Sequence, residues 1–177
     1  MSDPHTRLLT LKDVANYVAI DKTTAGLNRT MRQIRHWTQC DLLRTENPKS
    51  SGSGIPRLYA EEPSVFIAAM LLEVSRYGAT VDILRPLAEE LYEDWEGTQE
   101  HFFFAETNEG IVYAQISWAQ DPETGRFVDA QLHLFNEEED HPEDWLKSEP
   151  SSSILVNLNQ VMERVAGRIY APASNGP

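Results

Sequence analysis

The chain has a single cysteine among its 177 residues, and it has no long apolar run. One thiol, Cys40, excludes an internal disulfide and a zinc site made of several thiolates from one chain. The longest apolar run, Val65 to Leu72, is far shorter than the ~18 residues that a membrane-spanning helix needs. The first residues also lack the apolar core of a secretory signal. We therefore expect a soluble protein of the reducing cytoplasm, without a membrane partner or cofactor.

Positive charge is scarce, and most of it lies near the N-terminus. The whole chain has 15 Lys and Arg residues against 28 Asp and Glu residues, a net charge of −13. Residues 1–60 carry nine basic residues against five acids, a balance of +4, whereas residues 92–177 carry four against seventeen, a balance of −13. A local basic patch can still bind a polyanion, although repulsion from the rest lowers affinity and steepens its salt dependence. The two ends are thus expected to have different electrostatic partners.

Patterns typical of enzymes are also missing. We find no Ser-His-Asp set, no phosphate-binding loop and no paired carboxylates in apolar surroundings, so we expect no enzymatic activity. His101, His133 and His141 accompany the acidic run Glu137 to Asp140, but their spacing matches no recognised metal site. We interpret the acidic run as a solvated loop. The alternatives are a mimic of nucleic-acid phosphate and a contact with a basic partner.

The stretch from Thr30 to Leu43 predicts a short helix that lies on DNA. Thr30 and Gln33 have the spacing of a capping box, which predicts that the helix starts at Thr30. An apolar face is formed at three-residue spacing by Met31, Ile34 and Trp37. Arginine pairs with guanine and glutamine with adenine in the major groove, and either side chain can hold a phosphate. The hydrogen-bond donors that point away from the apolar face are Arg32, Gln33, Arg35 and His36.

Elements on both sides complete the N-terminal pattern. Leu9 to Val18 predicts a first helix with Thr10 as its N-cap. The connector Ala19 to Asn28 is longer than a tight turn, and it reads either as a loop or as an extra helical turn. Leu43 to Thr45 and Arg57 to Tyr59 could pair as a hairpin, the wing of a winged helix. The Gly- and Ser-rich run between them also fits a disordered linker.

A predicted helix pair follows the wing. Glu61 to Ser64 starts the first helix, which is apolar on most sides as far as Tyr77, and Gly78 ends it. Thr80 is the expected N-cap of the second helix. Pro86 either lies inside this helix or breaks it.

In this order the elements resemble the DNA-binding domain of MerR-type regulators over roughly residues 9–88. The motifs that carry the resemblance are Leu11-Lys12-Asp13-Val14-Ala15, Thr30 to Trp37, Asp41-Leu42-Leu43, Gly54, Arg57-Leu58-Tyr59 and Arg76 to Leu84. The resemblance implies a winged helix-turn-helix of bacterial type that binds double-stranded DNA as a homodimer, at an inverted-repeat operator that is distorted on binding. The expected DNA-binding residues are Arg29, Thr30, Arg32, Gln33, Arg35, His36, Arg44, Lys49, Arg57 and Tyr59.

The chain departs from that family in three respects. The connector before the second helix is longer than the family's turn. The long dimerisation helix that normally follows the winged helix is not obvious. No cysteine cluster is present, which excludes the subclass that senses thiophilic metals. Cys40 itself is interpreted as a small apolar filler at the helix end, with a redox switch as the alternative.

The C-terminal half has the two-residue period of strands. Residues 101–106, 111–119 and 126–136 predict a three-stranded antiparallel meander with turns at Asn108 to Gly110 and Asp121 to Gly125. A helical stripe should then cover the sheet, and it consists of Ile154, Leu158, Val161, Val165 and Ile169. Residues 171–177 should form a frayed tail.

The predicted fold class is α+β, with a winged helix-turn-helix at residues 1–92 and an acidic α+β domain at residues 93–177. The acidic domain is expected to dimerise, sense a small-molecule effector or contact a protein partner. The leading functional hypothesis is a sequence-specific, dimeric transcription regulator. The alternative is a non-enzymatic interaction protein, an antirepressor or accessory factor, whose acidic half is the working surface.

Overall fold

Helices and strands are mixed in the structure, a computed structural model that describes residues 7–47, 56–107, 110–121, 123–124, 127–136 and 152–169. This mixture confirms the predicted α+β class. Contacts divide the chain into two compact units, one formed by residues 1–70 and 164–177 and the other by residues 71–163. Among the helices in the described ranges, none is both long enough and apolar enough to cross a membrane.

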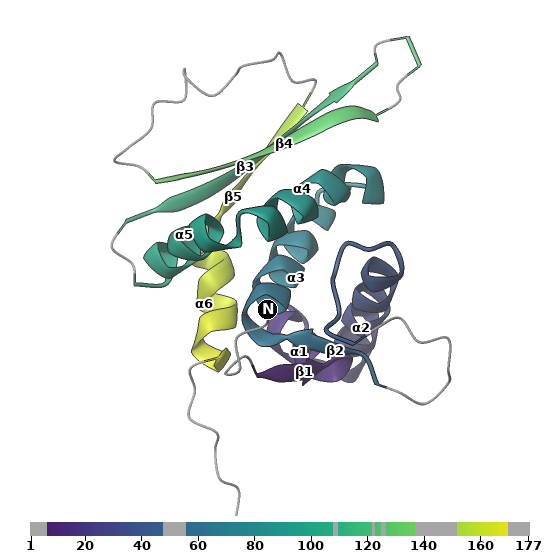
Figure 1. Cartoon of the computed structure of the whole chain (residues 1–177), viewed down its shortest axis with the longest axis vertical. Coiled ribbons are helices and arrows are strands. Elements are labelled where there is room, and N and C mark those ends of the chain that lie inside the picture. The colour runs from purple at the N-terminus through teal and green to yellow at the C-terminus, as the bar shows by residue number, and fades with distance from the viewer. Residues whose placement is uncertain are drawn as a thin grey trace, which may run out of the picture. The chain divides into compact units, whose positions relative to one another are not determined.

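The first unit contains a helix pair and a two-stranded antiparallel sheet (Figure 1). Strand β1 (Leu8–Thr10) leads directly into helix α1 (Leu11–Val18), and a five-residue turn joins α1 to helix α2 (Thr24–Gln39). Strand β2 (Leu58–Ala60) pairs with β1 and continues into helix α3 (Glu61–Ser75). Apolar side chains at helical spacing meet between these elements, and the buried set includes Leu9, Val14, Ala15, Val18, Ile34, Trp37 and Tyr59.

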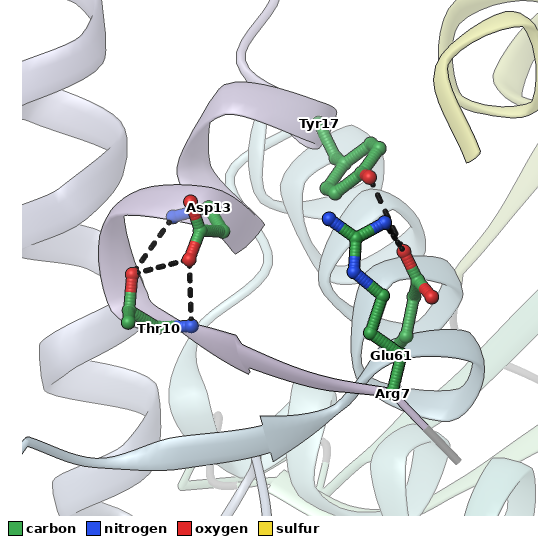
Figure 2. Close-up of polar contacts among 5 residues, drawn as sticks. All are labelled: Arg7, Thr10, Asp13, Tyr17 and Glu61. Atoms are coloured by element: carbon green, nitrogen blue, oxygen red, sulfur yellow. Dashed lines mark hydrogen bonds and ion pairs between the residues drawn. The ribbon is translucent and has the colours of Figure 1, made fainter. Parts of the chain in front are cut away.

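Helix α1 begins with a capping box, as shown in Figure 2. The Thr10 hydroxyl accepts a hydrogen bond from the Asp13 N–H at 3.3 Å, while Asp13 Oδ2 accepts one from the Thr10 N–H at 2.9 Å. The Thr10 hydroxyl also donates to Asp13 Oδ2 at 2.6 Å, and this bond is the main reason that the pKa of Asp13 is lowered. The predicted first helix with Thr10 as its N-cap is confirmed.

Glu61, at the start of α3, contacts side chains from the residue before β1 and from α1. Its Oε1 lies 3.2 Å from Nη1 of Arg7, just before β1, and accepts a hydrogen bond at 3.2 Å from the hydroxyl of Tyr17 on α1 (Figure 2). Burial raises the pKa of Tyr17, and the neighbouring negative charge of Glu61 raises it further. Because the Arg7 side chain is 65% exposed, the ion pair adds little stability. The arrangement instead orients α1 against the start of α3.

The predicted hairpin between Leu43 to Thr45 and Arg57 to Tyr59 is wrong. Strand β2 forms its ladder with β1, in the register Leu9 to Tyr59, and residues 43–45 do not form a strand on its other edge. Residues 44–47 run beside β2 with a single backbone bond, from the Glu46 N–H to the Leu58 carbonyl at 2.9 Å. The Asn47 side chain accepts from the Leu58 N–H at 3.0 Å and donates to the Pro56 carbonyl at 2.8 Å. Asn47 therefore closes the loop whose residues 48–55 lie outside the described part of the chain.

The second unit contains a three-stranded antiparallel sheet in the order β4-β3-β5, with β3 (Val112–Gln120), β4 (Phe127–Asn136) and β5 (Ser152–Asn157). The predicted small sheet and C-terminal helix, α6 (Leu158–Ile169), are thus confirmed. One strand assignment and one helix assignment are wrong. Residues 101–106 belong to helix α5 (Trp95–Thr107), and Ile154 lies in β5 rather than on the C-terminal helix.

Helices α4 (Val81–Glu93) and α5 lie along one face of this sheet (Figure 1), where α4 contacts β4 and α5 contacts both β3 and β4. The predicted domain boundary at residue 92 would separate α4 from the sheet, whereas these contacts group them together. Gly78, with a φ of +86°, ends the helical turn before α4 as predicted, and Pro86 lies inside α4. The buried face of the sheet carries Val112, Ala114, Ile116, Leu132 and Val156.

Asn159 on α6 joins three segments of the second unit. Its Oδ1 accepts a hydrogen bond from the Val112 N–H at 2.9 Å, and its Nδ2 donates to the carbonyls of Ala105 at 3.1 Å and Gly110 at 2.9 Å. The predicted turn after β3 is confirmed at Asp121, whose Oδ1 accepts from the Thr124 N–H at 2.7 Å. The predicted acidic loop at residues 137–144 and tail at residues 171–177 lie outside the described residues.

Candidate nucleic-acid interface

Helix α2 starts six residues earlier than predicted. Its N-cap is Thr23, whose hydroxyl accepts a hydrogen bond from the Gly26 N–H at 3.1 Å. Asp21 Oδ1 in turn accepts from the Thr23 N–H at 2.9 Å, and this bond is the main cause of the lowered pKa of Asp21. The predicted capping box of Thr30 and Gln33 is therefore wrong, because both residues already lie inside the helix.

The turn between α1 and α2 is consequently short. It comprises residues 19–23, and residues 24–28 are helical, so of the two predicted alternatives for the connector the extra helical turn is confirmed for its second half. Gly26 makes the tight turn possible, since a Cβ at this position would lie 2.4 Å from the backbone oxygen of Asp21. The result is a helix, a short turn and a second helix packed across it, the arrangement of a helix-turn-helix.

The end of α2 is equally well defined. Asp41 adopts a φ of 63°, the left-handed conformation that follows many helices. The Leu42 N–H donates to the Trp37 carbonyl at 2.9 Å and the Asp41 N–H to the Thr38 carbonyl at 3.4 Å, which is the hydrogen-bond pattern of a Schellman motif. Leu42 is buried directly after it. Both ends of α2 are thus anchored, so its orientation relative to α1 is fixed within the first unit.

The two faces of α2 differ sharply. One face is in the core and carries Gly26, Thr30, Ile34, Trp37 and Thr38. The other face is exposed and carries Thr24, Ala25, Asn28, Arg29, Arg32, Arg35, His36 and Gln39. The helix contains three arginines and one histidine but no Asp or Glu. In a chain with a net charge of −13, this is a strongly basic surface.

The structure separates the predicted DNA-binding residues into exposed and buried groups. The exposed residues are Arg29, Arg32, Arg35, His36 and Arg44. Gln33 is half-buried on the flank of α2. Thr30 is buried in the core face, which removes it from any surface contact. Lys49 lies outside the described residues.

Tyr59 is a core residue in the structure. Its side chain is fully buried, and its hydroxyl lies 2.9 Å from Oγ1 of Thr38. Because the Thr38 hydroxyl hydrogen is already donated to the Ile34 carbonyl at 2.8 Å, Tyr59 is the donor in this pair. The pair joins β2 to α2 and satisfies two buried polar groups. The predicted contact of Tyr59 with the DNA backbone is therefore corrected to a structural role.

The Arg57 side chain is neither fully exposed nor fully buried. The residue is half-buried at the start of β2, and its Nη1 is buried without a hydrogen-bond partner among the described residues. A phosphate contact through this nitrogen would need the side chain to move. The arginines on α2 are therefore more accessible than Arg57 at the start of the strand.

Asn28 is a surface residue that the sequence-based prediction missed. It lies on the exposed face of α2 in the second helical turn, and its side chain has no hydrogen bond to any other described residue. The signal for it was present, because Asp21, Thr23 and Gly26 have the spacing of a capped helix start. From the sequence this stretch reads either as a loop or as an extra helical turn, so Asn28 was not assigned to the helix.

No protein-family model matches the chain, and no curated protein matches it at a significant level. The case for a function therefore depends on the residues and geometry described above.

The second unit has a hollow of about 200 Å³ between α4, α5 and β4. Its polar side chains are engaged within the protein: Glu90 Oε2 accepts from the Leu132 N–H at 3.0 Å, and Asp94 Oδ1 accepts from the Gly97 N–H at 3.3 Å. Nδ1 of His101 lies 3.0 Å from the Gly97 carbonyl. Loss of hydration raises the pKa of Glu90, although the Leu132 N–H opposes this effect. Glu90 thus joins α4 to β4, and the contacts of Asp94 and His101 are local to the start of α5.

The remaining sequence-based predictions concern a metal site and Cys40. Within the described ranges, no three His, Cys, Asp or Glu side chains are grouped closely enough to hold a metal ion. Cys40 caps the end of α2 and is partly exposed, with its Sγ 3.8 Å from Nδ1 of His36. This position fits the interpretation of a residue at the helix end, and the alternative of a redox switch stays a hypothesis.

Proposed function

We propose that this protein is a sequence-specific DNA-binding transcription regulator of MerR-like type, in which α2 is the recognition helix. The observation that carries the proposal is the exposed face of α2. It presents Arg29, Arg32 and Arg35 to solvent without a single acidic residue on the same helix. Arginine contacts both guanine edges and phosphates, so such a face suits the major groove of DNA.

The surrounding structure supports this role. In helix-turn-helix proteins the first helix and the turn fix the second helix at the angle that the groove requires. Here the turn is anchored by Asp21, Thr23 and Gly26, and the far end of α2 by the Schellman motif at Asp41. The exposed side chains are thus carried by a rigid element, which lowers the entropic cost of binding.

A homodimer and an inverted-repeat operator belong to the same proposal. One recognition helix contacts only a few base pairs, and a two-fold symmetric pair of helices would double the length of DNA that is read. The second unit is the proposed site of dimerisation, effector binding or partner contact. Its acidic charge would then weaken nonspecific binding, because like charges repel the DNA backbone.

The test is selection of bound duplexes from a random pool by the purified full-length protein, followed by affinity measurements on the selected and scrambled sequences. The proposal predicts an enriched motif with two-fold symmetry and saturable binding that is at least ~1,000-fold tighter than binding to scrambled DNA. Enrichment of no motif at moderate salt would contradict it.

A second function is favoured by two exposed apolar residues in the acidic unit. Phe103 on α5 is 62% exposed and Leu155 on β5 is 57% exposed, and such residues are common in protein contacts. The alternative is therefore an interaction protein, an antirepressor or accessory factor, that uses this unit to bind another protein. It predicts no sequence preference in the selection experiment.

A further inference from the structure

The true start of α2 changes which of its residues can read bases. In helix-turn-helix complexes, base edges are contacted mainly by the N-terminal residues of the recognition helix. With a start at Thr24, the first exposed turns carry Thr24, Ala25, Asn28, Arg29 and Arg32. Gln33, which the sequence pattern favoured as the adenine reader, follows Arg32 on the third turn but is half-buried on the flank of the helix, whereas Arg32 is exposed.

We infer that Asn28 is a base-reading residue of this protein and that it recognises adenine, with Arg32 beside it as a guanine reader. This inference rests on the proposed DNA-binding function. Asparagine can accept from adenine N6 and donate to N7 at the same time, and arginine can donate twice to guanine. The two side chains are four positions apart, so they are neighbours on one face of the helix.

The helical geometry places Asn28 at the centre of the exposed face. At about 100° per residue, Asn28, Arg32 and Arg35 fall within roughly 60° of one another. This row lies opposite the buried face formed by Thr30, Ile34 and Trp37. Arg29 and His36 lie farther round, on the side nearer Gln33, where a residue meets the wall of a groove rather than its floor. The central row is therefore suited to base edges, and Arg29 to a phosphate.

The exposure and hydrogen bonding of the Asn28 side chain fit this role. Its side chain is exposed and makes no hydrogen bond to the other described residues, so both its donor and its acceptor are available. Ala25, one turn earlier, is small and leaves room for a base edge to approach. The N-terminus of α2 is less suited to a phosphate, because the negatively charged Asp21 carboxylate already accepts a hydrogen bond from the Thr23 N–H there.

The test compares Asn28→Ala with Gln39→Ala and Gln33→Ala, all in the full-length protein. Gln39 is a matched control, since it is an exposed amide at the other end of α2. Each variant is measured on the selected duplex and on its single-base variants. Circular dichroism and thermal unfolding confirm the fold, which Asn28→Ala should preserve because alanine favours an exposed helical position.

The expected result is a loss for Asn28→Ala that is confined to one adenine in each half-site. Wild type should prefer adenine there by about 5- to 150-fold, and the variant should bind all four bases at that position almost equally. Gln39→Ala should keep the wild-type preference at every position. If wild type selects a motif and Asn28→Ala leaves each base preference intact, the inference is wrong while the proposed function stands. If wild type selects no motif, both are wrong.

Discussion

At the scale of single residues, the core of the first unit contains a buried polar pair whose hydrogen bonds are satisfied. In this pair the Thr38 hydroxyl donates to the Ile34 carbonyl and accepts from Tyr59. The family resemblance implied a contact of Tyr59 with the DNA backbone. The burial of Tyr59 shows that this side chain joins β2 to α2 instead.

Tyr59→Phe should therefore reduce stability without directly affecting DNA binding. The variant loses one buried hydrogen bond, which contributes about 0.5–1.5 kcal/mol to the free energy of unfolding. Tyr77→Phe is the matched control, because Tyr77 is 61% exposed and should change stability by less than ~0.5 kcal/mol. Denaturant unfolding measures both. Equal stability of the two variants would mean that the buried pair makes no net contribution.

The capping box at Thr10 and Asp13 gives a dependence on pH. The folded-state pKa of Asp13 lies below its ordinary value of 3.8, chiefly because the Thr10 hydroxyl donates to the carboxylate. A group with a lowered pKa stabilises the folded state above its unfolded pKa, and this contribution is lost as the pH falls through the folded value. Wild type should thus exceed Asp13→Asn in stability near neutral pH, and the difference should shrink below about pH 4.

Urea unfolding of wild type, Asp13→Asn and Thr10→Val from neutral pH to about pH 2 checks this expectation. Thr10→Val removes the hydroxyl but keeps the side-chain shape, so it should lose the largest part of the pH dependence while the Thr10 N–H bond to Asp13 remains. Parallel stability curves for wild type and Asp13→Asn across the whole range would show that the Asp13 carboxylate adds no pH-dependent stability.

At the scale of secondary-structure elements, helix starts and strand partners are where the structure departs most from the sequence pattern. Thr30 and Gln33 have capping-box spacing, but the same residues occur inside helices, and the earlier cap at Thr23 prevails. The run of phenylalanines at 102–104 favours a strand, yet Asp94 binds the Gly97 N–H and starts a helix there. Local periodicity also cannot reveal that β2 pairs with β1, which is nearly fifty residues earlier.

Other elements were predictable because their signals are local. Thr10 begins α1, and Gly78 with its positive φ ends the turn before α4, as their residue types indicate. The basic face of α2 was also visible as the recurrence of Arg32, Arg35 and His36. Asn28 was not recognised as part of this face. Its place in the helix depends on Gly26, which has no side chain and so can lie close to Asp21.

Gly26→Ala should destabilise the protein more than Gly97→Ala, although both replace a glycine within a helix. A Cβ at Gly26 would lie 2.4 Å from the backbone oxygen of Asp21, whereas a Cβ at Gly97 would meet the end of the Asp94 side chain at 2.6 Å. A carboxylate can rotate away but the backbone of a tight turn cannot. Gly26→Ala should destabilise by about 1–3 kcal/mol, and Gly97→Ala should cost less than ~1 kcal/mol. Thermal unfolding measures both losses, and equal losses would contradict the close approach of Gly26 to the Asp21 backbone in the turn.

Asn159 and Asn157 allow a similar comparison in the second unit. Asn159→Asp replaces the amide that donates to the Ala105 and Gly110 carbonyls, so both acceptors lose their partner. We expect a loss of about 1–3 kcal/mol in the free energy of unfolding. Asn157→Asp keeps the oxygen that caps the Gln160 N–H and places a negative charge at the start of α6, which should be neutral or slightly stabilising. Similar losses in both variants would show that Asn159 does not link α6 to β3.

At the scale of the whole molecule, the charge is divided between opposite ends of the chain. Residues 1–60 have a balance of +4 and residues 92–177 a balance of −13. Such a protein binds a polyanion only where a basic surface is concentrated, and the exposed face of α2 provides one. Its affinity for DNA should fall steeply with salt, because each arginine that contacts a phosphate releases bound counterions.

The most direct test of the central claim is the salt dependence of DNA affinity for a variant in which Arg29, Arg32 and Arg35 are all replaced by glutamine. These side chains are exposed on α2, so their loss should leave the fold intact. The matched control replaces Arg76 and Arg85, two exposed arginines of the second unit, by glutamine. Fluorescence anisotropy on the selected duplex at several salt concentrations gives log Kd against log salt for each protein.

The α2 variant should bind at least ~100-fold more weakly at low salt, and its slope should be shallower by about two units or more. The control should match wild type in both respects. An α2 variant with the affinity and salt slope of wild type would show that this helix does not contact DNA.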